Sequence, residues 1–231
     1  MKQRCVIYSM QRTGHHAIIF WLVNNFGGYK RSMETYIFWD DNSKLYYYND
    51  CNHMSYYIVT NYKYLLLSYE DTYKYIDHEE DDKVVIILRD FINMLASRYQ
   101  KYGDKLAFNK TYLQDIDKII DMWKQHANEV INNKKIVVIL YNRWIFEKDY
   151  RNQICKSLGI ENKSDNISFV PEMGQGSSFC GMTVENNKDE YVNRYKKVCF
   201  SNSIKKKIRE DVELIDLNKK LFNIDLDNIL K

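Results

Sequence analysis

A short polar segment joins the first β-type run of the chain to its first helical run. Arg4–Tyr8 is typical of a strand, and the apolar stretch from His15 to about Phe26 is typical of a helix. The first turn of a helix has unpaired N–H groups and the positive end of the helix dipole, so a loop placed there can bind an anion. The residues in position to do so are Gln11, Arg12, Thr13, Gly14, His15 and His16.

Arg12 and Thr13 give this loop its chemistry. The planar guanidinium of Arg12 can hold two oxygens of a phosphate or sulfate, and the hydroxyl of Thr13 is a further donor. The loop lacks the G-x-x-x-x-G-K-[ST] pattern, which disfavours an ordinary P-loop nucleoside triphosphatase.

A second cationic group follows the strongest strand pattern. Lys83–Leu88 is a continuous β-branched run of the kind buried on both faces of a parallel sheet, and Arg89 comes directly after it. Ser97 lies two helical turns further on. Ligands bind at the carboxyl ends of parallel strands, so we expect Arg89 and Ser97 to converge on one anionic group. A surface salt bridge of Arg89 with Asp90 or with an acidic neighbour is the alternative.

These two segments together resemble the sulfotransferase superfamily, whose donor is 3′-phosphoadenosine 5′-phosphosulfate (PAPS). The loop around Arg12 is similar to the family's 5′-phosphosulfate loop, and Arg89 with Ser97 matches in type and spacing the pair that holds the 3′-phosphate. A weaker similarity lies at Ile139–Trp144. The family's proline before the basic residue is absent, and histidines replace its two threonines. The resemblance implies that residues 11–16, Arg89 and Ser97 bind PAPS.

A late glycine-bearing segment, Pro171–Gly181, is similar to the family's loop that closes over the nucleotide. Glycines let backbone amides approach a phosphate closely, and serines add donors. The resemblance therefore implies that Gly176, Ser177 and Ser178 contact the donor. A surface loop without a ligand is the alternative.

Sulfuryl transfer also needs a base that reaches the proton of the acceptor. The resemblance favours Glu34, because some members of the family use a glutamate shortly after the first helix. An imidazole beside the sulfuryl group could act as a base or as a cationic stabiliser, which makes His15 and His16 candidates, unless they only pack or cap the helix. His53 is a further candidate, whereas His78 beside Glu79 is typical of a surface ion pair.

The composition excludes several classes of protein. The chain has 231 residues, 45% of them apolar and 28% charged, which is typical of a globular domain. The net charge of +3 is too small to indicate nucleic acid or a membrane surface as a partner. No apolar run is long enough to span a bilayer, and no signal peptide is visible, so we expect a cytoplasmic protein with its five cysteines reduced.

The alternation of apolar runs predicts an α/β fold with three layers around a central parallel sheet, and the resemblance implies the P-loop-like sulfotransferase form of it. We expect one domain over residues 1–231, with a tyrosine-rich insert on the acceptor side at about 29–80 and C-terminal helices at about 188–231. Further strands are expected at Tyr36–Trp39, Tyr56–Thr60 and Ile136–Leu140, and helices at Tyr62–Tyr75, Phe91–Tyr102, Thr111–Asn132 and Trp144–Leu158.

The function expected from these observations is sulfuryl transfer from PAPS to a hydroxyl or amine of a small molecule or glycan, without a metal. Two alternatives remain: a nucleotide or nucleoside kinase with a degenerate phosphate loop, and a non-catalytic nucleotide-binding module of the same fold. The acceptor and the oligomeric state are not written in the sequence.

Overall fold

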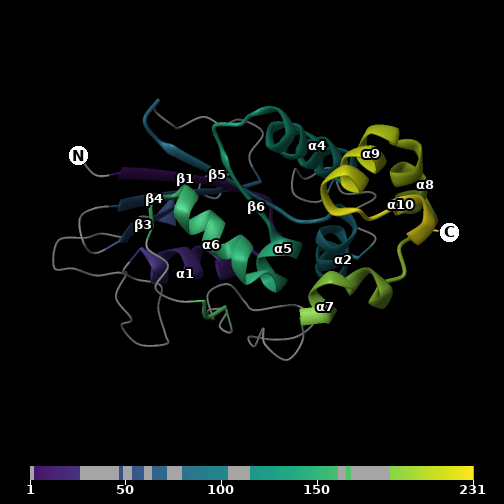
Figure 1. The fold of residues 1–231 in the computed structure, drawn as a ribbon. Coiled ribbons are helices and arrows are strands. Elements are labelled where there is room, and N and C mark those ends of the chain that lie inside the picture. Colours follow the sequence, from purple (N-terminus) through teal and green to yellow (C-terminus); the bar gives the residue numbers. More distant parts are fainter. Residues whose placement is uncertain are drawn as a thin grey trace.

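The central sheet has the strand order β2-β3-β4-β1-β5-β6 in the computed structural model (Figure 1). The model describes residues 3–26, 47–48, 54–59, 64–71, 80–103, 115–160, 165–167 and 188–230. Strands β4, β1, β5 and β6 are parallel, and β2 and β3 extend the sheet in antiparallel pairing. The strands are β1 (Gln3–Ser9), β2 (Tyr47–Tyr48), β3 (Met54–Val59), β4 (Tyr64–Glu70), β5 (Lys83–Leu88) and β6 (Val137–Leu140).

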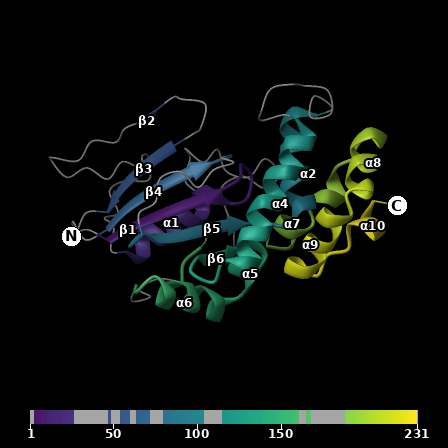
Figure 2. The same cartoon turned by 90° about the horizontal axis from the view of Figure 1, so that it is seen from above.

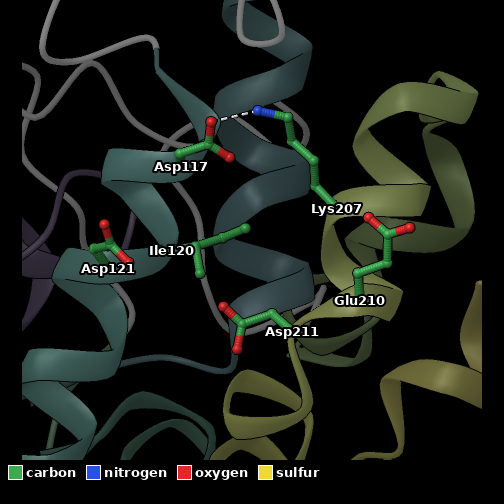
Figure 3. A pocket seen from close by; sticks show the side chains of 6 residues that line it. All are labelled: Asp117, Ile120, Asp121, Lys207, Glu210 and Asp211. Carbon is green, nitrogen blue, oxygen red and sulfur yellow. Dashed lines mark hydrogen bonds and ion pairs between the residues drawn. The ribbon is translucent and has the colours of Figure 1, made fainter.

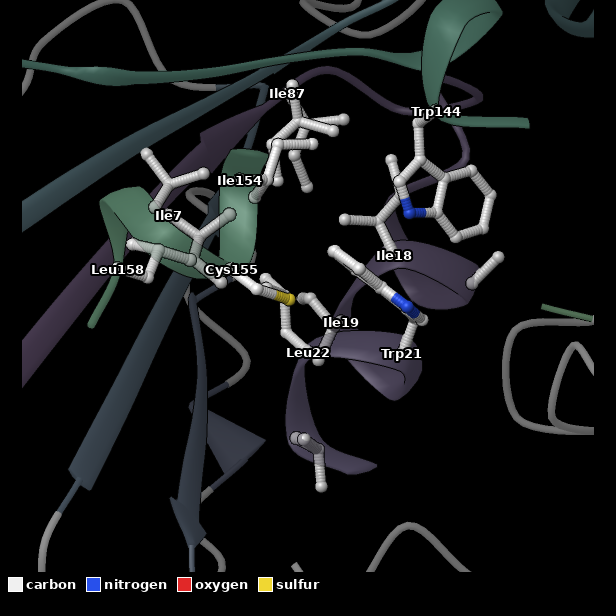
Figure 4. Packing of buried hydrophobic residues seen from close by; sticks show 14 of the residues in the cluster. Ile7, Ile18, Ile19, Trp21, Leu22, Ile87, Trp144, Ile154, Cys155 and Leu158 are labelled. Carbon is white, nitrogen blue, oxygen red and sulfur yellow. The ribbon is translucent and has the colours of Figure 1, made fainter. Parts of the chain in front are cut away.

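Both faces of β1 are buried, because alternate side chains of a strand point to opposite sides of the sheet. Cys5 and Ile7 pack into the cluster formed by helices α1 (His15–Asn25), α5 (Tyr141–Phe146) and α6 (Lys148–Ser157). Figure 4 shows this cluster, with side chains of α1 and α6 meeting those of β1 and β5. Val6 and Tyr8 pack on the opposite face.

Most of the remaining helices form a second core at one end of the sheet. Figures 1 and 2 both show the C-terminal helices gathered beside the helices that follow β5, on the side away from the N-terminus. Leu88 and Met10 pack into this core, which joins it to the ends of β5 and β1. Its elements are α2 (Phe91–Tyr102), α4 (Ile116–Asn132), the 3-10 helix η3 (Arg194–Lys197), α8 (Asn202–Glu210), α9 (Val212–Phe222) and α10 (Leu226–Ile229). Helix α7 (Lys188–Val192) packs instead against the first cluster through Tyr191 and Val192.

The α/β class and the parallel central strands are thus confirmed. Of the expected elements, Lys83–Leu88 and Phe91–Tyr102 have the predicted bounds, and the C-terminal part is helical as expected. Within the described residues, no helix is both long and apolar enough to cross a membrane.

Two predictions of secondary structure are wrong. The helix expected at Tyr62–Tyr75 is strand β4, because the ladders that it forms with β1 and β3 outweigh the helix propensity of its leucines. The single helix expected at Trp144–Leu158 is two helices, α5 and α6, that meet at Glu147 in an extended conformation. The strand expected at Tyr36–Trp39 lies outside the described residues.

Candidate functional site: the carboxyl edge of the parallel sheet

Each of the four parallel strands delivers one component of the candidate site at its carboxyl end. The loop Met10–Gly14 follows β1, Asp71 follows β4, Arg89 follows β5 and Tyr141 follows β6. Parallel strands end at the same edge of a sheet, which is where open α/β folds bind ligands. The sheet thereby brings together residues that are far apart in the sequence.

The loop Met10–Gly14 turns back on itself before α1 begins. The hydroxyl of Thr13 donates to the carbonyl oxygen of Met10 at 2.7 Å. Arg12 has φ of 71° and Gly14 has φ of 87°, so two of these residues lie in the left-handed region, where a residue other than glycine is strained. Strained backbone of this kind concentrates at binding sites and catalytic sites.

Tyr141 fixes the end of this loop from the opposite side. A Cβ atom added to Gly14 would lie 2.1 Å from Cε2 of the Tyr141 ring, so the ring occupies the space that a side chain at position 14 would need. The same ring lies under the guanidinium of Arg89, with 4.7 Å between Cζ and the ring centroid.

Arg89 is a buried cation that contacts the loop. Its Nη1 donates to the carbonyl oxygen of Arg12 at 3.1 Å, its Nη2 donates to the carbonyl oxygen of Tyr191, and only 1% of the residue is exposed. Nε of Arg89 has no partner among the described residues, and none of their carboxylates pairs with this arginine.

Asp90 is not the partner of Arg89, and Arg89 is buried, so the alternative of a surface salt bridge is wrong. One carboxylate oxygen of Asp90 accepts from the backbone N–H of Asn93 at 2.9 Å and caps α2, and the other accepts from Asn142 at 2.9 Å. A buried arginine without a carboxylate is costly unless an anion completes its surroundings.

Ser97 contacts an arginine that the sequence did not place at the site. The hydroxyl of Ser97 accepts from Nη1 of Arg194 at 3.0 Å, and both residues are buried. The guanidinium of Arg194 lies over the ring of Tyr191, 4.8 Å from its centroid, and Tyr191 also supplies the carbonyl that binds Arg89. The segment Lys188–Lys197 therefore links the two arginines at one edge of the sheet.

Asn93 holds that segment against α2. Its side-chain amide donates to the carbonyl oxygen of Val192 at 2.7 Å, and its oxygen accepts from the backbone N–H of Tyr195 at 3.3 Å. Both hydrogen bonds are partly buried, so they fix the position of Arg194 relative to Ser97.

The arginine of α2, Arg98, forms a buried ion pair beside the loop. Nη2 of Arg98 binds Oδ1 of Asp71, and each side chain is 1% exposed. The same oxygen accepts from the backbone N–H of Gln11 at 3.0 Å, so Asp71 ties the first polar residue of the loop to α2.

The two histidines at the start of α1 differ in environment. His15 is 3% exposed, and its ring nitrogens lie 2.6 Å from the hydroxyl of Ser9 and 2.7 Å from that of Ser68. Burial holds the pKa of His15 well below its ordinary value of 6.5, and the neighbouring His16 lowers it further. His16 is only half-buried and meets the ring of His15 edge-on. His15 is therefore neutral and enclosed, whereas His16 is accessible.

Several expected site residues lie outside the described residues. These are the candidate bases Glu34 and His53, the surface histidine His78, and the glycine-loop residues Gly176, Ser177 and Ser178.

Four residues of the site were not predicted from the sequence: Asp71, Arg98, Tyr141 and Arg194. Asp71 was hidden inside a stretch expected to be helical, and Arg194 is 97 residues from its partner Ser97. Tyr141 carried a usable signal, because it directly follows a buried strand, as Arg89 does.

A pocket of about 260 Å³ elsewhere on the surface has a different character. It is formed by α4, α8 and the junction before α9, and Figure 3 shows the carboxylates that line it together with Lys207, which pairs with Asp117. Its lining residues are Asp117, Ile120, Asp121, Lys207, Glu210 and Asp211. None of the loop or arginine residues of the candidate site takes part in it.

Comparisons of the chain with protein-family models, with curated proteins and with solved structures found no match.

Proposed function

We propose that this protein is a sulfotransferase that moves a sulfuryl group from PAPS to a hydroxyl or amine of a small-molecule or glycan acceptor. The observation that carries the proposal is Arg89, a buried cation that touches the Arg12 loop and has no carboxylate among the described residues. The resemblance in sequence names the ligand, and this arrangement supports an anion at that place.

The residues of the site fit a ligand with two separated anionic groups. The loop Met10–Gly14 and the first turn of α1 supply N–H groups and the side chain of Arg12 for one group. Ser97 with Arg194 supplies a hydroxyl and a guanidinium for the other. Arg89 lies between the loop and the Tyr191 segment that carries Arg194, so its charge can act on both.

In the transfer step, the acceptor oxygen or nitrogen forms a bond to sulfur as the bond from sulfur to the bridging phosphate oxygen breaks. The leaving adenosine 3′,5′-bisphosphate takes that electron pair, and a base takes the acceptor proton. Arg12 and the N-terminus of α1 stabilise the negative charge that grows on the leaving oxygen. No oxidation or reduction is involved, so positioning and charge stabilisation are the work of the protein.

Among the described candidates for the base, His16 fits better than His15. His15 has both ring nitrogens bonded to serines and is enclosed, whereas His16 is half-buried at the same helix terminus. Glu34 and His53 stay predictions.

The kinase alternative is less well supported by this geometry. A phosphoryl-transfer site of the P-loop type uses a loop lysine and a carboxylate at a neighbouring strand end that helps to hold magnesium. The residues between Ser9 and His15 include no lysine. Asp71 does lie at the neighbouring strand end, but Arg98 and the Gln11 N–H already bind one of its oxygens.

The direct test is a transfer assay with PAPS labelled in the sulfuryl group, run against phenols, alcohols, amines and glycans. We expect transfer to at least one class of acceptor, and we expect Arg12→Ala to reduce it by at least about a hundredfold, the cost of removing one main donor to a developing anion. Arg143→Ala is the control, because this arginine is exposed and pairs with Glu147 on the surface of α5.

Transfer that is equal in Arg12→Ala and Arg143→Ala would remove Arg12 from the mechanism. Binding of the donor without transfer to any acceptor class would favour the non-catalytic module instead.

A further inference from the structure

We propose that Asp71 weakens anion binding at the loop Met10–Gly14 through its buried negative charge, and that Arg98 limits this effect by pairing with it. Asp71 is then a positioning residue: it holds the loop in place, and its negative charge lowers the affinity of the loop for an anion. The inference rests on the proposed function only in treating the loop as an anion site.

The contacts of Asp71 place its charge at the loop. Oδ1 accepts from the backbone N–H of Gln11 at 3.0 Å, and the backbone N–H of Asp71 donates to the carbonyl oxygen of Ser9 at 3.0 Å. Asp71 has φ of 51°, a left-handed conformation that turns its side chain back to the end of β1. One residue thus anchors both the last residue of the strand and the first part of the loop.

This anchor has an electrostatic consequence for a bound anion. A buried carboxylate beside an anion site repels the ligand, and the repulsion is screened less by water there than at the surface. Arg98 contributes a positive charge at the same oxygen, with both side chains 1% exposed. The pair is neutral as a unit, but Asp71 alone makes the described hydrogen bond to the loop.

The second carboxylate oxygen of Asp71, Oδ2, allows the charge to be removed without the contacts of Oδ1. Oδ2 is buried and has no hydrogen-bond partner among the described residues. In Asp71→Asn, an NH₂ group can replace this oxygen, while Oδ1 remains an acceptor for Gln11 and Arg98. The variant therefore removes the charge and keeps the described contacts. Asp71→Ala removes the charge and the contacts together.

The experiment measures the affinity of the full chain for adenosine 3′,5′-bisphosphate by calorimetry. We expect Asp71→Asn to bind about three- to tenfold more tightly than the wild type, because one buried negative charge has been removed. Asp71→Ala is expected to bind more weakly than the wild type, because Gln11 loses its anchor. A purely structural role for Asp71 predicts unchanged binding in Asp71→Asn, which keeps the described contacts, and weaker binding only in Asp71→Ala.

The matched control is Asp82→Asn. Asp82 pairs with Arg4 at 3.2 Å and is also largely buried, but it lies beside the start of β1 rather than its end. Its loss is expected to leave the affinity for the bisphosphate unchanged.

Arg98→Gln provides the opposite change if Asp71→Asn does not fold, as judged by circular dichroism. It leaves the charge of Asp71 unpaired, so we expect the affinity to fall about tenfold or more. The inference is overturned if folded Asp71→Asn binds the bisphosphate no more tightly than the wild type. It is also overturned if folded Arg98→Gln binds it no more weakly than the wild type. Either result leaves the proposed function standing. A wild-type chain that does not bind the bisphosphate overturns this inference and the proposed function together.

Discussion

His15 shows how a residue with catalytic potential can be committed to structure instead. Its ring is enclosed between the hydroxyls of Ser9, at the end of β1, and Ser68, in β4. A neutral imidazole has one donor and one acceptor nitrogen, and the two serine hydroxyls can satisfy both. A proton on this ring would leave a charge in a fully buried position, so the native state keeps His15 neutral.

We expect the folded protein to lose stability in acid, because it buries histidines in the neutral form. Burial lowers the pKa of His15 and also that of His126 in α4, whereas both take up a proton near pH 6.5 when the chain is unfolded. Below that pH the unfolded state binds more protons than the native state, so the free energy of unfolding falls as the pH falls. The slope should reach up to about 1.4 kcal/mol per pH unit for each histidine.

Urea denaturation at pH 7.5, 6.5 and 5.5 measures how the free energy of unfolding changes with pH. In His15→Gln this slope should be smaller than in the wild type by the contribution of His15. Equal slopes in His15→Gln and wild type would show that His15 is not held neutral by the fold.

Single residues of the site were predictable where their signal was local. Arg89 was found because it directly follows a continuous apolar run, and it does lie at the carboxyl end of a central strand. Spacing placed Arg89 and Ser97 on one strand-and-helix unit, and their convergence on one anionic group stays a prediction. The spacing did not reveal that the hydroxyl of Ser97 accepts from Arg194. No periodicity in one sequence connects residues 97 positions apart.

At the scale of elements, the fit between the loop and α5 decides which residue position 14 can hold. Gly14 has φ of 87° and meets the ring of Tyr141, so a side chain there would be strained and would also clash. Because α5 begins directly after β6, the register of β6 beside β5 sets where that ring lies.

Gly14→Ala tests this fit against Gly159→Ala. Gly159 has φ of 70° but open space around it. The free energy of unfolding of Gly159→Ala should therefore fall only by the cost of a left-handed backbone, about 1–2 kcal/mol. The free energy of unfolding of Gly14→Ala should fall by about 1–3 kcal/mol more than that of Gly159→Ala, since the Tyr141 ring must move. Unfolding of both variants in urea gives the comparison, and equal losses would mean that Tyr141 does not restrict the loop.

The elements with uniform patterns were predictable, and those with mixed patterns were not. The β-branched run of β5 and the capped helix α2 were predicted with the right bounds. The stretch around Leu65–Leu67 has residues that suit a helix equally well, and only pairing with β1 and β3 makes it a strand. Because this stretch was expected to be a helix, Asp71 was not recognised as the residue that follows a strand.

At the scale of the whole molecule, sheet order assembles the site. β1 lies between β4 and β5, so the loop after β1 has Asp71 on one side and Arg89 on the other. The C-terminal segment then returns across the same edge and brings Tyr191 to Arg89, directly after β5, and Arg194 to Ser97 in α2. The strand order and this return depend on long-range contacts, which a single sequence does not reveal.

The proposed function requires this edge of the sheet to hold one adenine nucleotide by two anionic groups. The most direct measurement is calorimetric titration of the wild type, Arg89→Ala and Arg194→Ala with adenosine 3′,5′-bisphosphate and with adenosine 5′-monophosphate. We predict micromolar binding of the bisphosphate by the wild type, at least about tenfold weaker binding of the monophosphate, and a loss of that preference in both variants. Equal affinity of the wild type for the two nucleotides, or a preference that survives both substitutions, would contradict the account.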